Sequence, residues 1–250
     1  MLTPARRRGE ELLDDPAADG RLALRSLRDV ALANRFFGGR RAVLLAIAPI
    51  LREWRGADTS NSGSHAPAIP SPPLTILDLG TGLADIPAAA VRLAHRQGID
   101  ASAIGVERTL LLARTAAKRC GNAVTGDALH LPLADASVDI VTCSQVLHHF
   151  DGEQAERLLR ECTRVARRAV IVADLRRNWL AVAGLWAGSF LLRFHPVSRH
   201  DGMLSVLRGY TDGELRALVH RATGCVPQIR RSLGFRLSAT WHPRPPSSKA

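Results

Sequence analysis

Short apolar runs alternate with longer amphipathic segments in the stretch that begins at Leu74. The runs predict strands, and the segments 85–97, 109–119 and 152–166 between them predict helices. Strands that are apolar on both sides and separated by helices are typical of a parallel sheet with helices on both faces. We therefore predict a doubly wound α/β fold, with strands in the runs LTILDLG, ASAIGVE, NAVTGDA, VDIVTCS and AVIVAD.

The last two strand-like segments of this stretch are not separated by a helix. The apolar segments CVPQIRRS and FRLSATWH are separated only by Leu233 and Gly234. A connection this short joins antiparallel strands but cannot return the chain for a parallel pair. An antiparallel hairpin is therefore predicted to finish the sheet.

Residues 1–55 predict two helices joined at Gly38-Gly39, with Pro49 kinking the second. We expect this segment to form a helical cap, 56–73 to be a flexible linker because it is rich in Ser, Pro and Gly, and 243–250 to be a disordered tail after a main domain over 74–242. One apolar face is expected from Leu24, Leu27, Val30, Ala31 and Asn34, and another from Val43, Leu44, Ile47, Ile50, Leu51 and Trp54.

The composition is that of a globular protein. Of 250 residues, 46% are hydrophobic and 23% are charged, which excludes a wholly disordered chain and a disulfide-stapled miniprotein. No uncharged apolar run is long enough to span a bilayer, and no apolar segment follows the N-terminal arginines as in a signal peptide, so a cytoplasmic location is expected.

The formal charge of +11 comes almost entirely from scattered arginines, which favours a solvated surface. Aromatic residues are only 4% of the chain, too few to alternate with the arginines as stacking platforms, so no specific nucleic-acid partner is expected. The four cysteines form no CxxC pair, and we expect reduced thiols and no metal.

Two glycines and two carboxylates lie at the predicted end of the first strand, in Asp78-Leu79-Gly80-Thr81-Gly82-Leu83-Ala84-Asp85. Ligands of open α/β sheets bind at this edge, and glycine lets the backbone approach them closely. Asp85 occupies the third glycine position of a dinucleotide-binding loop, where a carboxylate would face a pyrophosphate. The loop therefore favours a cationic ligand with an amino acid part over NAD.

Carboxylates also follow the next two predicted strands. Glu107 lies where a carboxylate can accept both ribose hydroxyls, although a solvated surface residue is an equal alternative. Asp127, followed by Ala128 and Leu131-Pro132, lies where an adenine amino group could donate to it. Carboxylates at three successive strand ends are more specific together than any one alone.

The chain resembles the class I S-adenosylmethionine-dependent methyltransferases through LDLGTGLADIP at 77–87, GVE at 105–107, GDALHLPLADASVDIV at 126–141 and SQVLHHF at 144–150. The resemblance implies a Rossmann-like seven-stranded sheet with a terminal antiparallel hairpin. It implies that S-adenosylmethionine is bound by Asp78, Gly80 and Gly82 at the methionine end, Glu107 at the ribose, Asp127 and Ala128 at the adenine, and Ser144 above the cofactor. Asp85 is added to the expected cofactor-binding residues because its charge, with that of Asp78, can face an ammonium or sulfonium. Ala84 departs from the family, where many members have a third glycine.

The stretch SLRDVALANRFFGGRRAVL resembles the N-terminus of a group of bacterial small-molecule methyltransferases in which two leading helices cover the cofactor. Such helices would exclude water from the transfer. The alternative is that the helix pair simply caps the sheet.

His148 and His149 follow the fourth predicted strand, at the expected mouth of the pocket. Either imidazole is a candidate general base, because its pKa lies near neutrality. The alternative is that the two residues cap strand and helix ends.

The segment WLAVAGLWAGSFLLRF at 179–194 is apolar around nearly the whole helix. A helix of this kind is buried, lies on a membrane or walls an apolar cavity. We expect it to bind an apolar or aromatic acceptor, and plain packing or membrane-surface contact are the alternatives. The expected substrate residues are Trp179 and Trp186, with Arg176, Arg199, His200 and Arg208 available to an acidic or phenolic group.

These observations predict an enzyme that methylates a small apolar or phenolic metabolite, most simply at oxygen. A different class of function is a non-catalytic protein that binds the cofactor or a membrane surface. Methylation of nitrogen, carbon or a macromolecule also stays open, and the sequence does not predict the oligomeric state.

Overall fold

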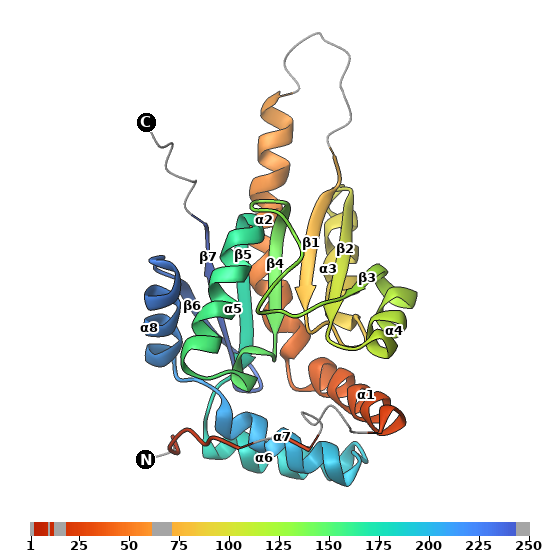
Figure 1. Cartoon of the computed structure of the whole chain (residues 1–250), viewed down its shortest axis with the longest axis vertical. Helices are drawn as coiled ribbons and strands as arrows, with labels where there is room; N and C mark the ends of the chain where they lie inside the picture. The colour runs from red at the N-terminus through yellow and green to blue at the C-terminus, as the bar shows by residue number, and fades with distance from the viewer. Residues whose placement is uncertain (1–2, 10, 13–18, 62–71, 244–250) are drawn as a thin grey trace.

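The structure, a computed structural model, describes residues 3–9, 11–12, 19–61 and 72–243. Its strands form one sheet in the order β3-β2-β1-β4-β5-β7-β6 (Figure 1). β7 runs antiparallel to β5 and β6, and the remaining pairs are parallel. The predicted fold class is confirmed. The strands are β1 Leu74–Leu79, β2 Ala101–Glu107, β3 Gly121–Thr125, β4 Val138–Ser144, β5 Ala166–Leu175, β6 Gln228–Ser232 and β7 Arg236–Trp241.

Helices cover both faces of the sheet because successive strand residues point to opposite sides. In β1, Leu77 and Leu79 pack toward α5 and α8, whereas Leu74 and Ile76 pack toward α2 and α3. The helices are α1 Gly20–Phe36, α2 Gly39–Asn61, α3 Asp85–Arg96, α4 Leu110–Cys120, α5 Gly152–Val165, α6 Trp179–Leu191, α7 Pro196–Arg208 and α8 Asp212–Thr223, with a short 3-10 turn η1 Leu147–His149.

The two N-terminal helices have different roles. Ile47 and Leu51 of α2 are fully buried in the core beneath the sheet, so α2 belongs to the α/β sandwich. In contrast, α1 lies with α6 and α7 across the carboxyl ends of the parallel strands (Figure 1). Of the two predicted roles, capping the sheet fits α2. A position over the strand ends, where ligands of such sheets bind, fits α1.

The face that α1 buries matches the predicted one only in part. It consists of Ser26, Asp29, Ala33 and Asn34, of which only Asn34 was predicted. Leu27 and Val30 of the predicted face line a cavity, and Val30 is 38% exposed. Apolar periodicity missed Ser26 and Asp29 because the buried side of α1 is mostly polar.

The element boundaries correct one domain prediction. α2 continues through Pro49 to Asn61, so the predicted linker at 56–73 begins too early. Residues 62–71 of that linker and 244–250 of the predicted tail lie outside the described residues. Within the described part, the four cysteines are free thiols and no helix has the length and apolar character needed to cross a bilayer.

Candidate functional site

The turn after β1 requires its glycines. Gly80 and Gly82 have φ angles of +60° and +56°, a region that side chains other than glycine rarely adopt. A Cβ on Gly80 would lie 2.5 Å from Val146 Cγ2, and one on Gly82 would lie 3.2 Å from Leu27 Cδ2. Ala84 has a left-handed φ of 53°, which gives a physical reason for the glycine that many relatives carry there. The loop backbone is thus held close beneath α1.

Asp78 lies beneath this loop and is 2% exposed. Thr142 donates a hydrogen bond from Oγ1 to Asp78 Oδ1. Burial raises the pKa of Asp78 to about 7 against the effect of this hydrogen bond, and the nearby carboxylates of Asp85 and Glu107 raise it further. A buried acidic group of this kind favours a cationic ligand, because a positive charge would stabilise its ionised form.

Glu107 shapes the same loop from the end of β2. Its carboxylate accepts hydrogen bonds from the backbone N–H groups of Gly82 and Arg108, and burial raises its pKa despite them. Asp127 is exposed beyond β3, and the pKa of its carboxyl is lowered by the backbone N–H of Leu129. Ala128 is partly buried against the core beside it. The carboxylates thus follow neighbouring strands, as predicted.

A cavity of about 510 Å³ opens from the glycine loop. Asp78, Gly80, Gly82 and Asp85 line it, and so does Ser144 at the end of β4. The Ser144 hydroxyl is buried and has no hydrogen-bond partner among the described residues. An unsatisfied hydroxyl facing a cavity indicates a polar ligand. Glu107, Asp127 and Ala128 do not line this cavity.

A polar chain closes the cavity between α1 and the terminal hairpin. Asn34 accepts a hydrogen bond from Gln145 Nε2, and Gln145 Oε1 accepts one from Arg236 at 2.8 Å. Arg236 also donates to the carbonyl of Phe37 at 2.9 Å, and burial lowers the pKa of its guanidinium to about 10. This chain ties the α1–α2 turn to the sheet.

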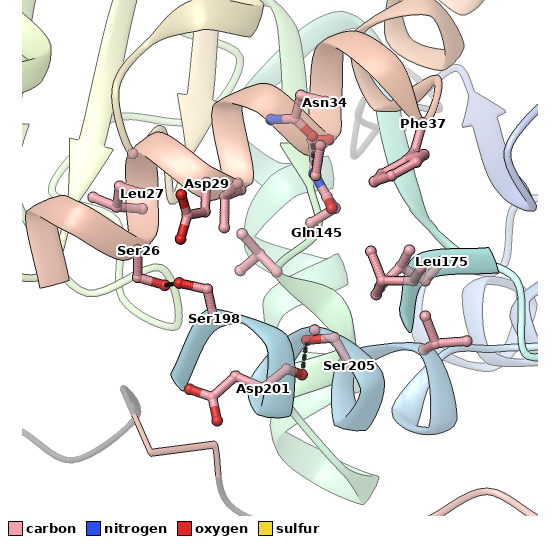
Figure 2. A pocket seen from close by; sticks show the side chains of 18 of the residues that line it. Ser26, Leu27, Asp29, Asn34, Phe37, Gln145, Leu175, Ser198, Asp201 and Ser205 are labelled. Carbon is pink, nitrogen blue, oxygen red and sulfur yellow. Dashed lines mark hydrogen bonds between the residues drawn. The ribbon is translucent and has the colours of Figure 1, made fainter. Parts of the chain in front are cut away.

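Beyond the glycine loop the cavity continues into a chamber between α1, α6 and α7 (Figure 2). Ser198 donates to Ser26 at 3.0 Å, and Asp29 accepts from the backbone N–H of His195 at 2.9 Å. These side chains form a polar strip along α1 and α7. The other walls are apolar and come from Phe37, Leu175, Leu180, Ala181, Leu185, Phe194, Val206 and Phe235.

His148 is 3% exposed and belongs to a charged cluster. Its Nδ1 lies 2.7 Å from Asp174 Oδ1, and its Nε2 lies 3.5 Å from Glu11 Oε1. Burial opposes the charged form, but both carboxylates outweigh it and raise the pKa of His148 to about 9. Arg208, 3.6 Å from Glu11, completes a balanced set of charges. His148 is thus an ion-pair residue and is wrongly placed among the general bases.

His149 has a different environment although it is the next residue. It lines the cavity, and its ring centroid lies 4.3 Å from that of His148. Its backbone carbonyl accepts a hydrogen bond from Arg208 at 2.9 Å, which fixes the short η1 turn. Of the two candidate bases, only His149 faces the space that a substrate would occupy. Glu11, His148 and His149 also each place one ligand-type atom within 4.8 Å of the others.

Comparison with known proteins finds a family model that matches part of this site. Residues 77–173, from β1 into β5, match a family model described as a methyltransferase domain. The match indicates a methyltransferase domain over this segment. The glycine loop, Asp78 and Ser144 described above fit a polar, cationic ligand, as S-adenosylmethionine is.

Curated relatives support the methyltransferase domain over part of their length. A demethylmenaquinone methyltransferase from Thermotoga maritima is 34% identical over 98 residues, which cover 38% of this chain and 40% of the relative. A malonyl-[acyl-carrier protein] O-methyltransferase from Methylococcus capsulatus is 35% identical over 126 residues, which cover 45% and 44%. The chain thus spans less than half the length of these relatives.

Solved structures extend the likeness in fold. A TehB-like SAM-dependent methyltransferase from Corynebacterium glutamicum aligns with a TM-score of 0.52 at 14% identity, covering 92% of this chain and 100% of that one. A SAM-dependent methyltransferase from Aquifex aeolicus aligns with a TM-score of 0.50 at 14% identity over 68% and 82%. The methyltransferase fold therefore extends beyond residues 77–173.

The residues predicted to bind the acceptor lie outside the cavity of the methyltransferase domain. Trp179 and Trp186 are 43% and 52% exposed on the outer side of α6. The two tryptophans are therefore wrongly predicted, although Leu180, Ala181 and Leu185 of the same helix do line the cavity. A helix that is apolar all round gives no signal for which side faces inward. Arg176, Arg199, His200 and Arg208 do not line the cavity either.

The polar strip and the contact of Glu11 with His148 carry no signal in the sequence. Glu11, Asp29, Ser198 and Asp201 line the cavity but lie far apart in the sequence, and no motif marks them. Asn34 belongs to the face of α1 that is expected to be apolar. Its polarity inside that face was the one signal that could have indicated a buried contact.

Proposed function

We propose that this protein transfers a methyl group from S-adenosylmethionine to a hydroxyl of a small apolar or phenolic metabolite, in the cytoplasm. The observation that carries the proposal is the continuity of one cavity, which passes from the glycine loop into a chamber with apolar walls and a polar strip. A cavity of about 510 Å³ suits a small molecule rather than a folded partner.

Bound S-adenosylmethionine supplies an electrophilic methyl group on a sulfonium. The chain would then hold the acceptor oxygen in line with that methyl and take up its proton. We assign the proton to His149, because it lines the cavity while His148 is buried in its ion pairs. The α1 helix and the Asn34–Gln145–Arg236 chain would exclude water during the transfer.

The relatives do not agree on an acceptor. One is named for demethylmenaquinone and another for malonyl-[acyl-carrier protein]. We favour the apolar metabolite because aromatic and aliphatic side chains from Phe37, Leu185, Phe194 and Phe235 form most of the chamber wall.

One observation favours a second candidate, methylation of an amine. Asp29 is 5% exposed and lines the chamber, and no cationic side chain pairs with it among the described residues. A buried carboxylate is costly unless a cation or hydrogen bonds compensate it. An ammonium group of an acceptor would provide that compensation.

The experiment is an acceptor screen that measures S-adenosylhomocysteine released from S-adenosylmethionine. Phenols, apolar alcohols and matched amines are offered to the wild-type protein and to Asp78→Asn as the inactive control. Turnover with phenols supports oxygen transfer, and turnover with amines alone supports the second candidate. Cofactor binding without turnover of any acceptor class would contradict the proposal and favour the non-catalytic alternative.

A further inference from the structure

The α6 helix exposes a continuous apolar surface. Its sequence, WLAVAGLWAGSFL, contains no charged residue. Five large side chains on it are exposed, and we call them the outer face of α6. They are Trp179 at 43%, Leu180 at 54%, Trp186 at 52%, Phe190 at 48% and Leu191 at 84%.

This face lies at one end of the molecule. Figure 1 shows α6 below the carboxyl ends of the strands, with α7 beside it and the sheet above it. Ala181 and Ser189 are the buried residues of α6, and Trp186 packs edge-on against Phe190 with ring centroids 4.9 Å apart. Trp186 and Phe190 thus pack on each other and project into solvent rather than into the core. Exposed patches of this kind mark interaction surfaces.

The charges around the outer face have one sign. Arg193 follows α6 and is exposed, and Arg199 of α7 lies with its guanidinium 3.6 Å from the centroid of the Phe190 ring. Asp201 is the one acidic residue between 179 and 208, and it is 4% exposed. The exposed charge of this helical pair is therefore positive.

We propose that the outer face of α6 docks onto the surface of an anionic lipid bilayer. Trp and Phe side chains favour the boundary between headgroups and acyl chains, and arginines favour anionic headgroups. With 13 residues, α6 is too short to span a bilayer and would lie in its plane. A second copy of the chain fits less well, because a two-fold contact would bring the two sets of arginines together.

Docking would place the cavity beside the lipid. Leu180 lines the cavity and also belongs to the outer face, so it lies at the cavity edge. An apolar acceptor dissolved in the bilayer would then reach the chamber without crossing water. This consequence rests on the proposed function, whereas docking itself does not.

The test is cosedimentation of the whole chain with phosphatidylcholine vesicles and with vesicles that also contain phosphatidylglycerol. We expect binding to the anionic vesicles, with a blue shift of tryptophan emission as Trp179 and Trp186 leave water. The double variant Trp186→Gln/Phe190→Gln should bind roughly tenfold or more weakly. Val226→Gln is the matched control, because Val226 is 71% exposed next to β6 at the opposite end of the sheet.

A second variant tests the charges. Arg193→Gln/Arg199→Gln should weaken binding to anionic vesicles by roughly fivefold for each arginine, with little change on phosphatidylcholine alone. Calorimetric titration with S-adenosylmethionine shows whether each variant is folded. Absence of binding to anionic vesicles by a folded wild type, or equal binding by the Trp186→Gln/Phe190→Gln variant, would overturn the proposal. Self-association through the face without vesicle binding would also overturn it.

Discussion

Asp174 accepts two hydrogen bonds from His148, one from the backbone N–H at 3.0 Å and one at the ring Nδ1 at 2.7 Å. The imidazole is thereby fixed between Asp174 and Glu11. Glu11 belongs to the segment before α1, of which residues 3–9 and 11–12 are described, and we call this segment the N-terminal arm. The two histidines after β4 thus have different roles. His148 ties the arm to the sheet, and His149 faces the cavity.

The His148 ion pairs should make stability depend on pH. Because the pKa of His148 is raised from 6.5 to about 9, its stabilisation is complete below about pH 6.5 and is lost as pH rises through about 9. His148→Gln should lower the free energy of unfolding by about 3–5 kcal/mol near neutral pH and flatten this dependence. Urea unfolding across the range measures both effects. An equal loss in the exposed His95→Gln variant would contradict the assignment.

Asp78 also makes stability fall as pH rises, but replacing it should stabilise the fold, whereas replacing His148 should destabilise it. Its folded pKa of about 7 against 3.8 means that the folded chain holds a proton that the unfolded chain has lost, so stability falls as pH rises between these values. Asp78→Asn should therefore raise the free energy of unfolding above about pH 7, at about 1.4 kcal/mol per unit of pKa shift removed. Thermal unfolding at high and low pH checks this. A destabilised variant would show that the buried charge is compensated.

His149→Gln should lower the rate of methyl transfer to a hydroxyl by roughly 100-fold or more, since general bases contribute on that order. Affinity for S-adenosylmethionine should stay unchanged, because the histidine is assigned to the acceptor proton. Turnover against pH and calorimetric titration of the same variant separate the two effects. Equal turnover with the same pH profile would leave His149 a structural residue.

Asp29→Asn distinguishes the two acceptor classes. If an ammonium pairs with the Asp29 carboxylate, the variant should raise the KM of an amine acceptor by roughly tenfold or more and leave the KM of a matched phenol unchanged. Ser198→Ala is a neighbouring control that removes a hydroxyl without changing charge. An unchanged KM for both acceptors would remove Asp29 from acceptor recognition.

The sheet and the cofactor loop were predictable because both depend on local patterns. Apolar runs of strand length separated by helical segments determine the order of β and α elements, and the glycines at positions 80 and 82 follow directly from the need for positive φ. The hairpin was predictable for the same reason, since the Leu233-Gly234 turn is too short for a crossover.

The acceptor chamber was not predictable because it depends on tertiary contacts between distant segments. The contacts of Ser26 with Ser198 and of Glu11 with His148 join residues more than a hundred positions apart, and no spacing rule links them. The prediction of which side of α6 faces the cavity was wrong for another reason. Its apolar residues surround the helix axis, so no pattern indicates whether Trp186 faces the cavity or solvent.

The most direct test of the account is calorimetric titration of the whole protein with S-adenosylmethionine and S-adenosylhomocysteine, with NADH as the comparison ligand. We predict micromolar or tighter binding of the first two and none of NADH, because Asp85 would face its pyrophosphate. Asp78→Asn should lose most of the affinity while remaining folded. Binding of NADH, or no binding of either adenosyl compound by the folded wild type, would contradict the assignment of the glycine loop.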